Sequence, residues 1–206
     1  MPRCLAEFFG DLSPFQIIVS AVAFLTGIYT LYKSFLEKAK ISMYPGDAVR
    51  IVVSPDGRVS NFHLMCNLIN KSTKVGTVHR LEVRVSGPQH TTNSFIWNLF
   101  YRYLPGGEEV QKESDVYPLA IPQKDSKLML VGFQSEEEKG FKWSEGRYEF
   151  KVIGWVNRKH RLQSSNLESI FHIQLSKDII HQLSKPNLSC PIYITVPITE
   201  WERKHK

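Results

Sequence analysis

Histidines have the widest range of possible chemistry in this chain, because imidazole binds metals and exchanges protons near neutral pH. The sequence contains seven, at His63, His79, His90, His160, His172, His181 and His205. None stands in a His-x-His or His-Glu-x-x-His pattern, and the three cysteines form no Cys-x-x-Cys pair. His63 and His79 can meet if their strands are neighbours. Without a ligand spacing, however, we interpret the histidines as ordinary surface residues and expect no metal.

The patterns that mark common catalytic sites are absent from the sequence. It has no Gly-x-Ser-x-Gly nucleophile turn, no phosphate-binding P-loop and no Gly-x-Gly-x-x-Gly dinucleotide motif. Residues 136–138 are all Glu, which is typical of a solvated loop, and Asp115 and Asp125 have no evident acidic partner. We therefore expect a non-enzymatic protein without catalytic residues and without a cofactor.

Basic residues gather in one expected loop and at the C-terminus, in residues 200–206. Clusters of this kind can attract anionic lipid headgroups, but a solvated turn and a frayed tail are the simpler interpretation, which we favour. No platform of exposed aromatic residues accompanies them, so we do not expect a nucleic-acid partner. Trp155 interrupts a charged strand face and is expected to be exposed. The candidate interaction residues are Trp155, Arg158, Lys159, His160 and Arg161.

The formal net charge is +6 and the isoelectric point is about 9.2, but Lys and Arg alternate with acids along the chain. We interpret this as a mildly basic, solvated surface. Hydrophobic residues make up 42% and aromatic residues 12% of the sequence. This composition fits one globular domain rich in β structure, of about 165 residues once an anchor is set aside.

Residues 15–32 contain no charge, and at about 1.5 Å per residue they would form a helix of roughly 27 Å. Ser13 can cap this helix with Pro14 at its first position. A buried core helix or a cleaved signal peptide are the alternatives, but the preceding residues lack the basic start of a signal peptide. We predict a transmembrane helix over 15–33, with the apolar anchor residues Phe15, Ile17, Ile18, Val19, Val22, Phe24, Leu25, Ile28 and Leu31.

Charges beside the anchor indicate its orientation. Lys33, Lys38 and Lys40 follow it, whereas only Arg3 precedes it. Because excess Lys and Arg stay on the cytoplasmic side, we expect a single-pass protein of the plasma (inner) membrane with its β domain in the cytoplasm. Ala23 and Gly27 have the small-xxx-small spacing of helix dimers, so a homodimer remains open.

Beyond Pro45 the hydrophobic period changes from helical to two. The pattern predicts eight or nine strands, the clearest at 49–53, 62–68, 78–85, 92–104, 128–133, 147–156, 171–175 and 192–198. A slip in alternation between Val78 and Leu81 indicates a bulge. Pro197 suits an edge strand. A short helix is expected over 178–183.

The longest aromatic strand carries alternating apolar side chains at Phe95, Trp97, Leu99, Tyr101 and Tyr103, which we expect on one inward face. Cys66 is likewise expected to point inward as a free thiol, although a Cys66–Cys190 disulfide stays open.

The alternating pattern over residues 41–198 resembles that of uncharacterised bacterial single-pass membrane proteins with an immunoglobulin- or fibronectin-like domain. The resemblance implies an antiparallel β-sandwich, with a closed barrel as the alternative. It divides the chain into a short N-terminal segment (1–14), the transmembrane helix (15–33), a juxtamembrane helix or linker (34–44), the sandwich (45–199) and the basic tail (200–206).

The sequence therefore predicts a membrane-anchored, non-enzymatic binding or interaction module. Its partners would be the lipid bilayer, through the helix, and a protein of unknown identity. The alternative is a membrane-anchored sensor, in which a small molecule binds inside the β domain and reorganises the anchor helices.

Overall fold

The computed structural model describes residues 13–32, 38–53, 61–89, 91–103, 110–135, 143–157, 165–184 and 192–202. The chain divides into two units, Met1–Lys38 and Ala39–Lys206. Lys33, residues 34–37 of the expected linker and residues 203–206 of the expected basic tail lie outside the described residues.

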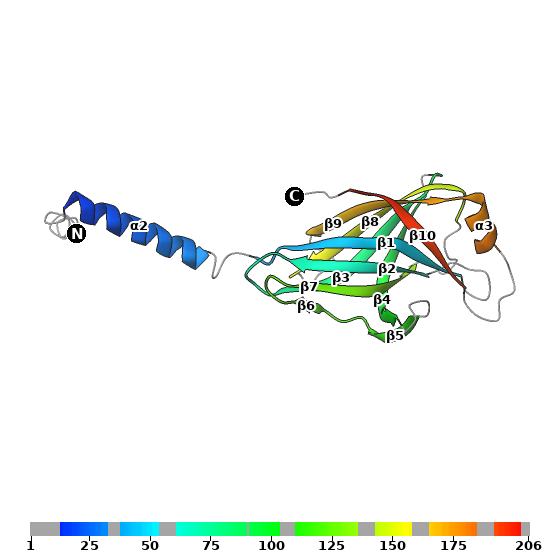
Figure 1. Ribbon diagram of the computed structural model, residues 1–206, viewed down its shortest axis with the longest axis horizontal. Coiled ribbons are helices and arrows are strands. Elements are labelled where there is room, and N and C mark those ends of the chain that lie inside the picture. Colours follow the sequence, from blue (N-terminus) through cyan, green and yellow to red (C-terminus); the bar gives the residue numbers. More distant parts are fainter. Residues whose placement is uncertain are drawn as a thin grey trace. The chain divides into compact units, whose positions relative to one another are not determined.

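The first unit contains helix α2 (Pro14–Leu31), which has 18 residues, a mean hydropathy of 1.6 and no buried residue (Figure 1). Its length and composition are sufficient to cross a membrane. Ser13 caps the helix: its hydroxyl accepts from the Gln16 amide at 3.3 Å, and the Gln16 side chain accepts from the Ser13 amide at 2.8 Å. This reciprocal capping box, with Pro14 at the first helical position, confirms the predicted start.

The described residues of the second unit form ten strands and one short helix, α3. In chain order they are β1 (Ile41–Val53), β2 (Asn61–Asn70), β3 (Gly76–Ser86), β4 (Thr92–Tyr103), β5 (Val110–Asp115), β6 (Leu119–Ile121), β7 (Ser126–Ser135), β8 (Gly146–Val156), β9 (Leu167–Leu175), α3 (Lys177–Leu183) and β10 (Ile192–Glu202). β1 thus begins inside the expected linker, and β10 runs into the expected tail. The predicted short helix is confirmed as α3.

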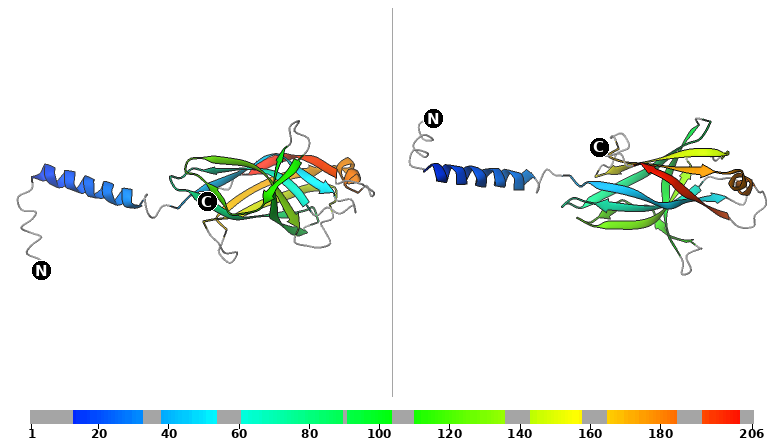
Figure 2. Two further views of the ribbon diagram at one scale, coloured as in Figure 1. Left: turned by 90° about the horizontal axis from the view of Figure 1, so that it is seen from below. Right: turned by 45° about the horizontal axis from the view of Figure 1, so that its top comes forward.

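Eight strands close into an antiparallel barrel (Figure 1, Figure 2). Neighbours follow the order β4-β7-β2-β1-β10-β9-β8-β3, and β3 pairs back with β4, from Glu82 opposite Ile96 to Ser86 opposite Thr92. The predicted sandwich, and with it the immunoglobulin-like fold, is wrong. Both architectures bury one face of every strand and give the same alternation. Only the long-range pairing of β3 with β4 distinguishes a barrel from a sandwich, and this pairing has no effect on the hydrophobic period of the sequence.

Aromatic rings fill the barrel interior. The Phe62 ring centroid lies 5.0 Å from that of Phe95, 5.3 Å from Phe133 and 5.4 Å from Phe150. The inward residues of β2, Phe62, Leu64, Cys66 and Leu68, are fully buried, as their alternation predicts. Cys66 is a free thiol, and burial raises its pKa. Cys190 lies outside the described residues.

Register shifts interrupt four of the strand pairings in the barrel wall that the structure describes. The predicted bulge in β3 is confirmed by a shift between Val78 and Arg80 in its pairing with β8. Pro45 lies inside β1, where the pairing with β2 shifts, so it bends a strand instead of ending a helix. Pro197 does not lie on an edge strand. It is the last residue of β10 to pair with β1, and the pairing with β9 begins at Ile198. A residue without an N–H is tolerated where a strand exchanges partners.

Another of these shifts changes which side chains of β4 point inward. The pairing of β4 with β7 shifts between Trp97 and Leu99. Phe95 and Trp97 are buried as predicted, but Phe100 then takes the next core position. The prediction that Tyr101 and Tyr103 continue the inward row is therefore wrong, because one extra residue turns the rest of the strand over.

Candidate functional site

A row of outward-facing residues crosses four adjacent strands of the barrel wall. Thr195 of β10 lies opposite Arg50 of β1, Arg50 opposite His63 of β2, and His63 opposite Gly132 of β7. Each has neighbours in the strand that point into the core, so the strand period alone places this row outside.

His63 is buried although it faces outward, with only 3% of its surface exposed. Its ring centroid lies 4.1 Å from that of Tyr101 and 5.6 Å from that of Tyr193. Burial first, and the positive charge of Arg50 second, lower the pKa of His63 from 6.5 to about 4. The imidazole is therefore neutral at physiological pH. Its buried Nδ1 atom has no hydrogen-bond partner among the described residues.

Tyr101 reaches His63 because Gly132 leaves room for its ring. A Cβ atom at Gly132 would lie 2.6 Å from Cε2 of Tyr101 and 3.1 Å from Oδ1 of Asn98. Any side chain there would displace the phenol from the wall. Burial raises the pKa of Tyr101, and the nearby Tyr193 phenol raises it further.

Arg50 lies beside two further tyrosines. Its guanidinium carbon is 5.3 Å from the ring centroid of Tyr103 and 5.5 Å from that of Tyr193. Tyr103 is 40% and Tyr193 39% exposed, so the rings shield the cation without covering it fully. A guanidinium beside aromatic rings is partly desolvated, which strengthens its attraction for an anion.

These groups surround a hollow of about 260 Å³ on the outside of the barrel. It is lined by Ala48, Arg50, His63, Met65, Tyr103, Leu130 and Thr195. We call it the Arg50 hollow. A neutral imidazole and a guanidinium at one end face the apolar side chains of Met65 and Leu130 at the other, so the hollow is amphipathic.

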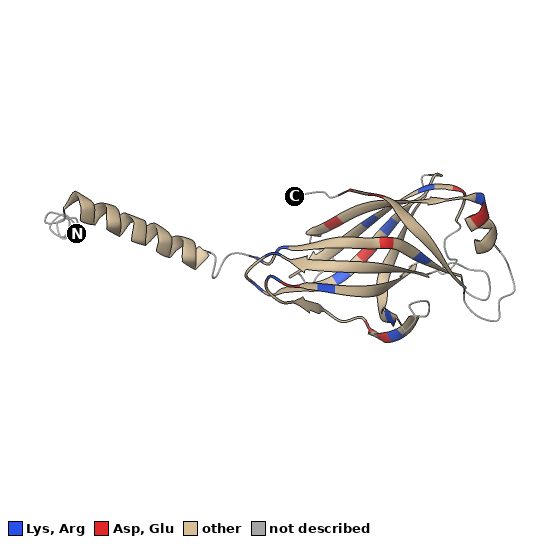
Figure 3. Cartoon of the chain, in the orientation of Figure 1, with Lys and Arg blue, Asp and Glu red and all other residues tan. Residues whose placement is uncertain are grey.

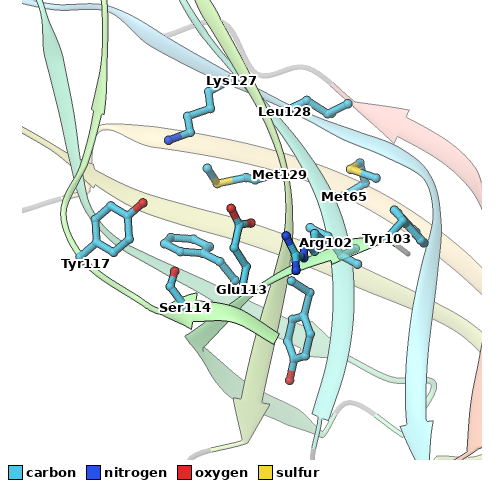
Figure 4. Close-up of a pocket in the computed structure, with 12 residues that line it drawn as sticks. Met65, Arg102, Tyr103, Glu113, Ser114, Tyr117, Lys127, Leu128 and Met129 are labelled. Carbon is cyan, nitrogen blue, oxygen red and sulfur yellow. The ribbon is translucent and has the colours of Figure 1, made fainter. Parts of the chain in front are cut away.

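A second hollow of about 290 Å³ adjoins it and shares Met65, Tyr103 and Leu130 (Figure 4). We call it the Met129 hollow. It opens where β4 leaves the barrel wall: β4 pairs with β7 as far as Tyr101 opposite Leu130 and then continues beside β5. Its other lining residues are Phe100, Tyr101, Arg102, Glu113, Ser114, Tyr117, Lys127, Leu128 and Met129.

Together the two hollows form a groove that combines apolar side chains with charged ones: Arg50 lies in one hollow, and Arg102, Glu113 and Lys127 line the other. Thioether side chains such as Met65 and Met129 adapt to varied apolar partners. Arg50 can receive a carboxylate, and His63 can supply or accept one hydrogen bond. A ligand with an acidic group next to an apolar one matches this arrangement.

The structure does not place the predicted interaction residues in this groove. Trp155 is 6% exposed, and the guanidinium carbon of Arg80 lies 5.7 Å from its ring centroid. The expectation that Trp155 is exposed is therefore wrong, because a long side chain of the neighbouring strand covers it. Arg158, Lys159, His160 and Arg161 lie outside the described residues, and their role stays a prediction.

The other histidines that the structure describes form no comparable site. His63 and His79 do not lie on neighbouring strands, since β2 pairs with β1 and β7, and β3 with β4, β6 and β8. His172 lies on the outer wall, 3.7 Å from a carboxylate oxygen of Glu149. No group of three or more His, Cys, Asp or Glu among the described residues could hold a metal ion.

Sequence reasoning missed Arg50, His63 and Tyr101 because their meeting depends on register. The available signals were a polar residue between apolar neighbours in two strands and a glycine inside the apolar strand around residue 132. A search against family models and curated proteins found no match to this chain.

Proposed function

We propose that this chain is a membrane-tethered, non-enzymatic binding module, and that the groove on the outside of its barrel binds a segment of a partner protein. The segment carries an acidic group beside apolar or aromatic side chains. Helix α2 anchors the module in the membrane. The barrel lies on the cytoplasmic side, as the lysines that follow the helix indicate.

The position of Arg50 is the observation that carries this proposal: it lines a hollow on the outer wall, and its guanidinium carbon lies 5.3 and 5.5 Å from the ring centroids of Tyr103 and Tyr193. A guanidinium that aromatic rings partly desolvate attracts an anion more strongly than one in open water. His63 lines the Arg50 hollow, and Arg50 adds the positive charge. A carboxylate held by Arg50 would bring hydrogen-bonding atoms to the same end of the groove.

The groove favours a polypeptide over a small molecule. Two adjoining hollows of about 260 and 290 Å³ can each hold one or two side chains of an extended segment. The sensor alternative needs a cavity inside the barrel. The interior aromatic rings instead pack with centroids about 5 Å apart, and both hollows described here lie outside.

Catalysis has less support than binding. The neighbours of His63 are aromatic rings and a cation, and no carboxylate is paired with it among the described residues. A general base needs a pKa near the working pH, whereas that of His63 is about 4.

The test uses the full chain in lipid nanodiscs as bait for a random peptide library, with empty nanodiscs as the counter-selection. Enriched peptides should combine Asp, Glu or a terminal carboxylate with an aromatic or aliphatic residue. Arg50→Gln should weaken their binding about 10- to 100-fold, the value of a charge-assisted bond. Arg50→Lys should recover only part of the affinity, because lysine lacks the planar fork.

Arg147→Gln is the matched control. Arg147 is another outer-wall arginine, bonded to Glu200 at 2.6 Å and 52% exposed, so its loss should leave peptide affinity unchanged. Peptides without acidic groups, or equal losses for both variants, would contradict the proposal.

A further inference from the structure

One end of the barrel joins three segments that are distant in the sequence. The side chain of Asn70, 1% exposed, donates hydrogen bonds to the carbonyl oxygens of Lys74 at 2.6 Å, Ile121 at 3.1 Å and Pro122 at 3.0 Å. The Lys71 amide donates to the carbonyl oxygen of Lys40 at 3.2 Å. The start of β1, the β2–β3 loop and the β6–β7 turn are therefore held together.

These segments carry lysines on their exposed surface. We call the surface the lysine end; it consists of Lys40, Lys71, Lys74, Val75, Lys124 and Lys127. Lys124 is held near the β2–β3 loop because its amide donates to the carbonyl oxygen of Ser72 at 3.1 Å. The one acid on these segments is Asp125, whose carboxylate accepts from the Ser126 amide at 2.7 Å. Basic colouring marks this end of the barrel, where β1 begins (Figure 3).

Val75 adds an apolar residue to the cationic surface. Its side chain is 61% exposed in the loop that contains Lys71 and Lys74. An exposed aliphatic side chain among lysines is the arrangement by which peripheral surfaces bind bilayers, since lysines meet headgroups while an apolar side chain enters the acyl boundary.

We propose that the lysine end docks on a bilayer that contains anionic lipids, with Val75 entering the headgroup region. The inference rests on the proposed membrane anchor. Six residues separate Tyr32 from Ala39, so the connecting chain spans at most about 25 Å. A surface tethered this closely meets the headgroups at a high effective concentration, and weak contacts then suffice for docking.

Charge supplies most of the attraction. Each lysine near an anionic leaflet contributes about 1 kcal/mol, and the contribution is lost beyond about one Debye length, roughly 10 Å at moderate salt.

The β8–β9 connection leaves and re-enters the barrel at this same end, since the Asn157 amide donates to the carbonyl oxygen of Thr77 at 2.7 Å. Its basic residues 158–161 lie outside the described residues and are not needed for the proposal.

The experiment places an environment-sensitive dye at Val75→Cys in the full chain, with Cys4 and Cys190 changed to Ser. Cys66 is fully buried and stays unlabelled. The chain is reconstituted in nanodiscs of phosphatidylcholine with or without phosphatidylserine, and quenching by nitroxide-labelled headgroups is measured. Quenching should be strong with phosphatidylserine, weak without it, and lost at high salt.

The matched dye position is Gln89→Cys, an exposed site after β3 at the opposite end of the barrel, which should not be quenched. Lys71→Glu and Lys124→Glu should each reduce the ratio of docked to undocked barrel at least about five-fold, the fold-change that corresponds to ~1 kcal/mol. Lys177→Glu, on α3, should leave it unchanged.

Three results would overturn the inference. Equal quenching at positions 75 and 89 would show no preferred end, and quenching that ignores phosphatidylserine would remove the electrostatic cause. Displacement of the barrel from the disc by a small amount of single-stranded RNA would identify a nucleic-acid surface instead. Elution of the chain apart from the discs would mean that the anchor itself fails, a separate failure that size-exclusion chromatography detects.

Discussion

The imidazole of His63 lies against the phenol of Tyr101, with ring centroids 4.1 Å apart and ring planes inclined by 32°. The two residues come from strands that are not neighbours, since β7 lies between β2 and β4. Gly132 of β7 has no side chain, so the Tyr101 ring can pass over this position to reach His63. This contact buries a titratable group on the outer wall of a barrel whose interior is apolar. His63 lines the Arg50 hollow and Tyr101 lines the Met129 hollow, so each hollow contributes one of the two residues.

Acid should destabilise the protein through His63. Its pKa is about 4 in the folded chain and 6.5 without burial, so the unfolded state binds more protons between these values. The free energy of unfolding should therefore increase as the pH rises from about 4 to about 6.5. The contribution of His63 to it should be lost as the pH falls through the same window. From about pH 7 to about pH 5 the loss assigned to His63 is about 2 kcal/mol.

Urea unfolding of the wild type and His63→Gln in the same detergent, followed by tryptophan fluorescence, measures this difference. The variant should lose about 2 kcal/mol less than the wild type over that pH range. Parallel pH profiles for the two proteins would show that His63 titrates normally in the folded chain.

A methyl group at Gly132 should disturb Tyr101. Because the new Cβ would lie 2.6 Å from Cε2 of Tyr101, Gly132→Ala should destabilise the barrel by about 1–3 kcal/mol and weaken peptide binding. In a Tyr101→Leu background the same substitution should cost less, since the ring is gone. A double-mutant cycle in urea measures the coupling, and additive effects would refute the close approach.

Asn70 should be among the most sensitive polar residues. Its amide nitrogen donates to three backbone carbonyls, and its Oδ1 accepts from the amide and the hydroxyl of Ser72 at 3.1 and 2.6 Å. Asn70→Ala should lower the free energy of unfolding by about 2–4 kcal/mol, because several buried backbone groups lose partners. The exposed Asn157, whose Oδ1 accepts one hydrogen bond from the Thr77 amide at 2.9 Å, offers a milder comparison as Asn157→Gly, because glycine tolerates the positive φ of 56° at this position. A similar small cost for both would contradict the role of Asn70.

Peptide affinity should increase as the pH falls below neutrality. A bound carboxylate beside His63 would favour the imidazolium and raise the His63 pKa from about 4, so binding takes up protons. The dissociation constant should fall from about pH 7.5 to about pH 5.5 and rise again once the peptide carboxylate is protonated near pH 4. Fluorescence anisotropy against His63→Gln, whose affinity should not vary in this way, measures the effect.

Local patterns predicted much of the barrel core and little of its closure. The alternation in residues 62–68 correctly identified an inward row because strand period is a property of neighbouring residues. The pairing of Glu82 with Ile96 joins β3 to β4 and closes the barrel. No pattern in either strand specifies which residues pair there. The sandwich was therefore predicted in place of a barrel.

The candidate site lay beyond sequence reasoning for a related reason. One inserted residue after Trp97 moved Tyr101 from the expected core row to the outer wall. β5, of sequence VQKESD, was not predicted, since a strand attached outside the barrel has no buried face to show in its pattern. Trp155 was misplaced because Arg80 of β3 lies opposite it and beside its ring, and neither strand's pattern specifies that pairing.

Mapping the bound peptide would test the central claim most directly. A peptide from the library selection, with benzoylphenylalanine in place of its aromatic residue, is cross-linked to the full chain in nanodiscs and the product is analysed by mass spectrometry. Methionine C–H bonds react readily with this group, so the adducts should fall on Met65 or Met129, and Arg50→Gln should abolish them. Adducts confined to residues outside the two hollows, or unchanged by Arg50→Gln, would show that the groove is not the binding site.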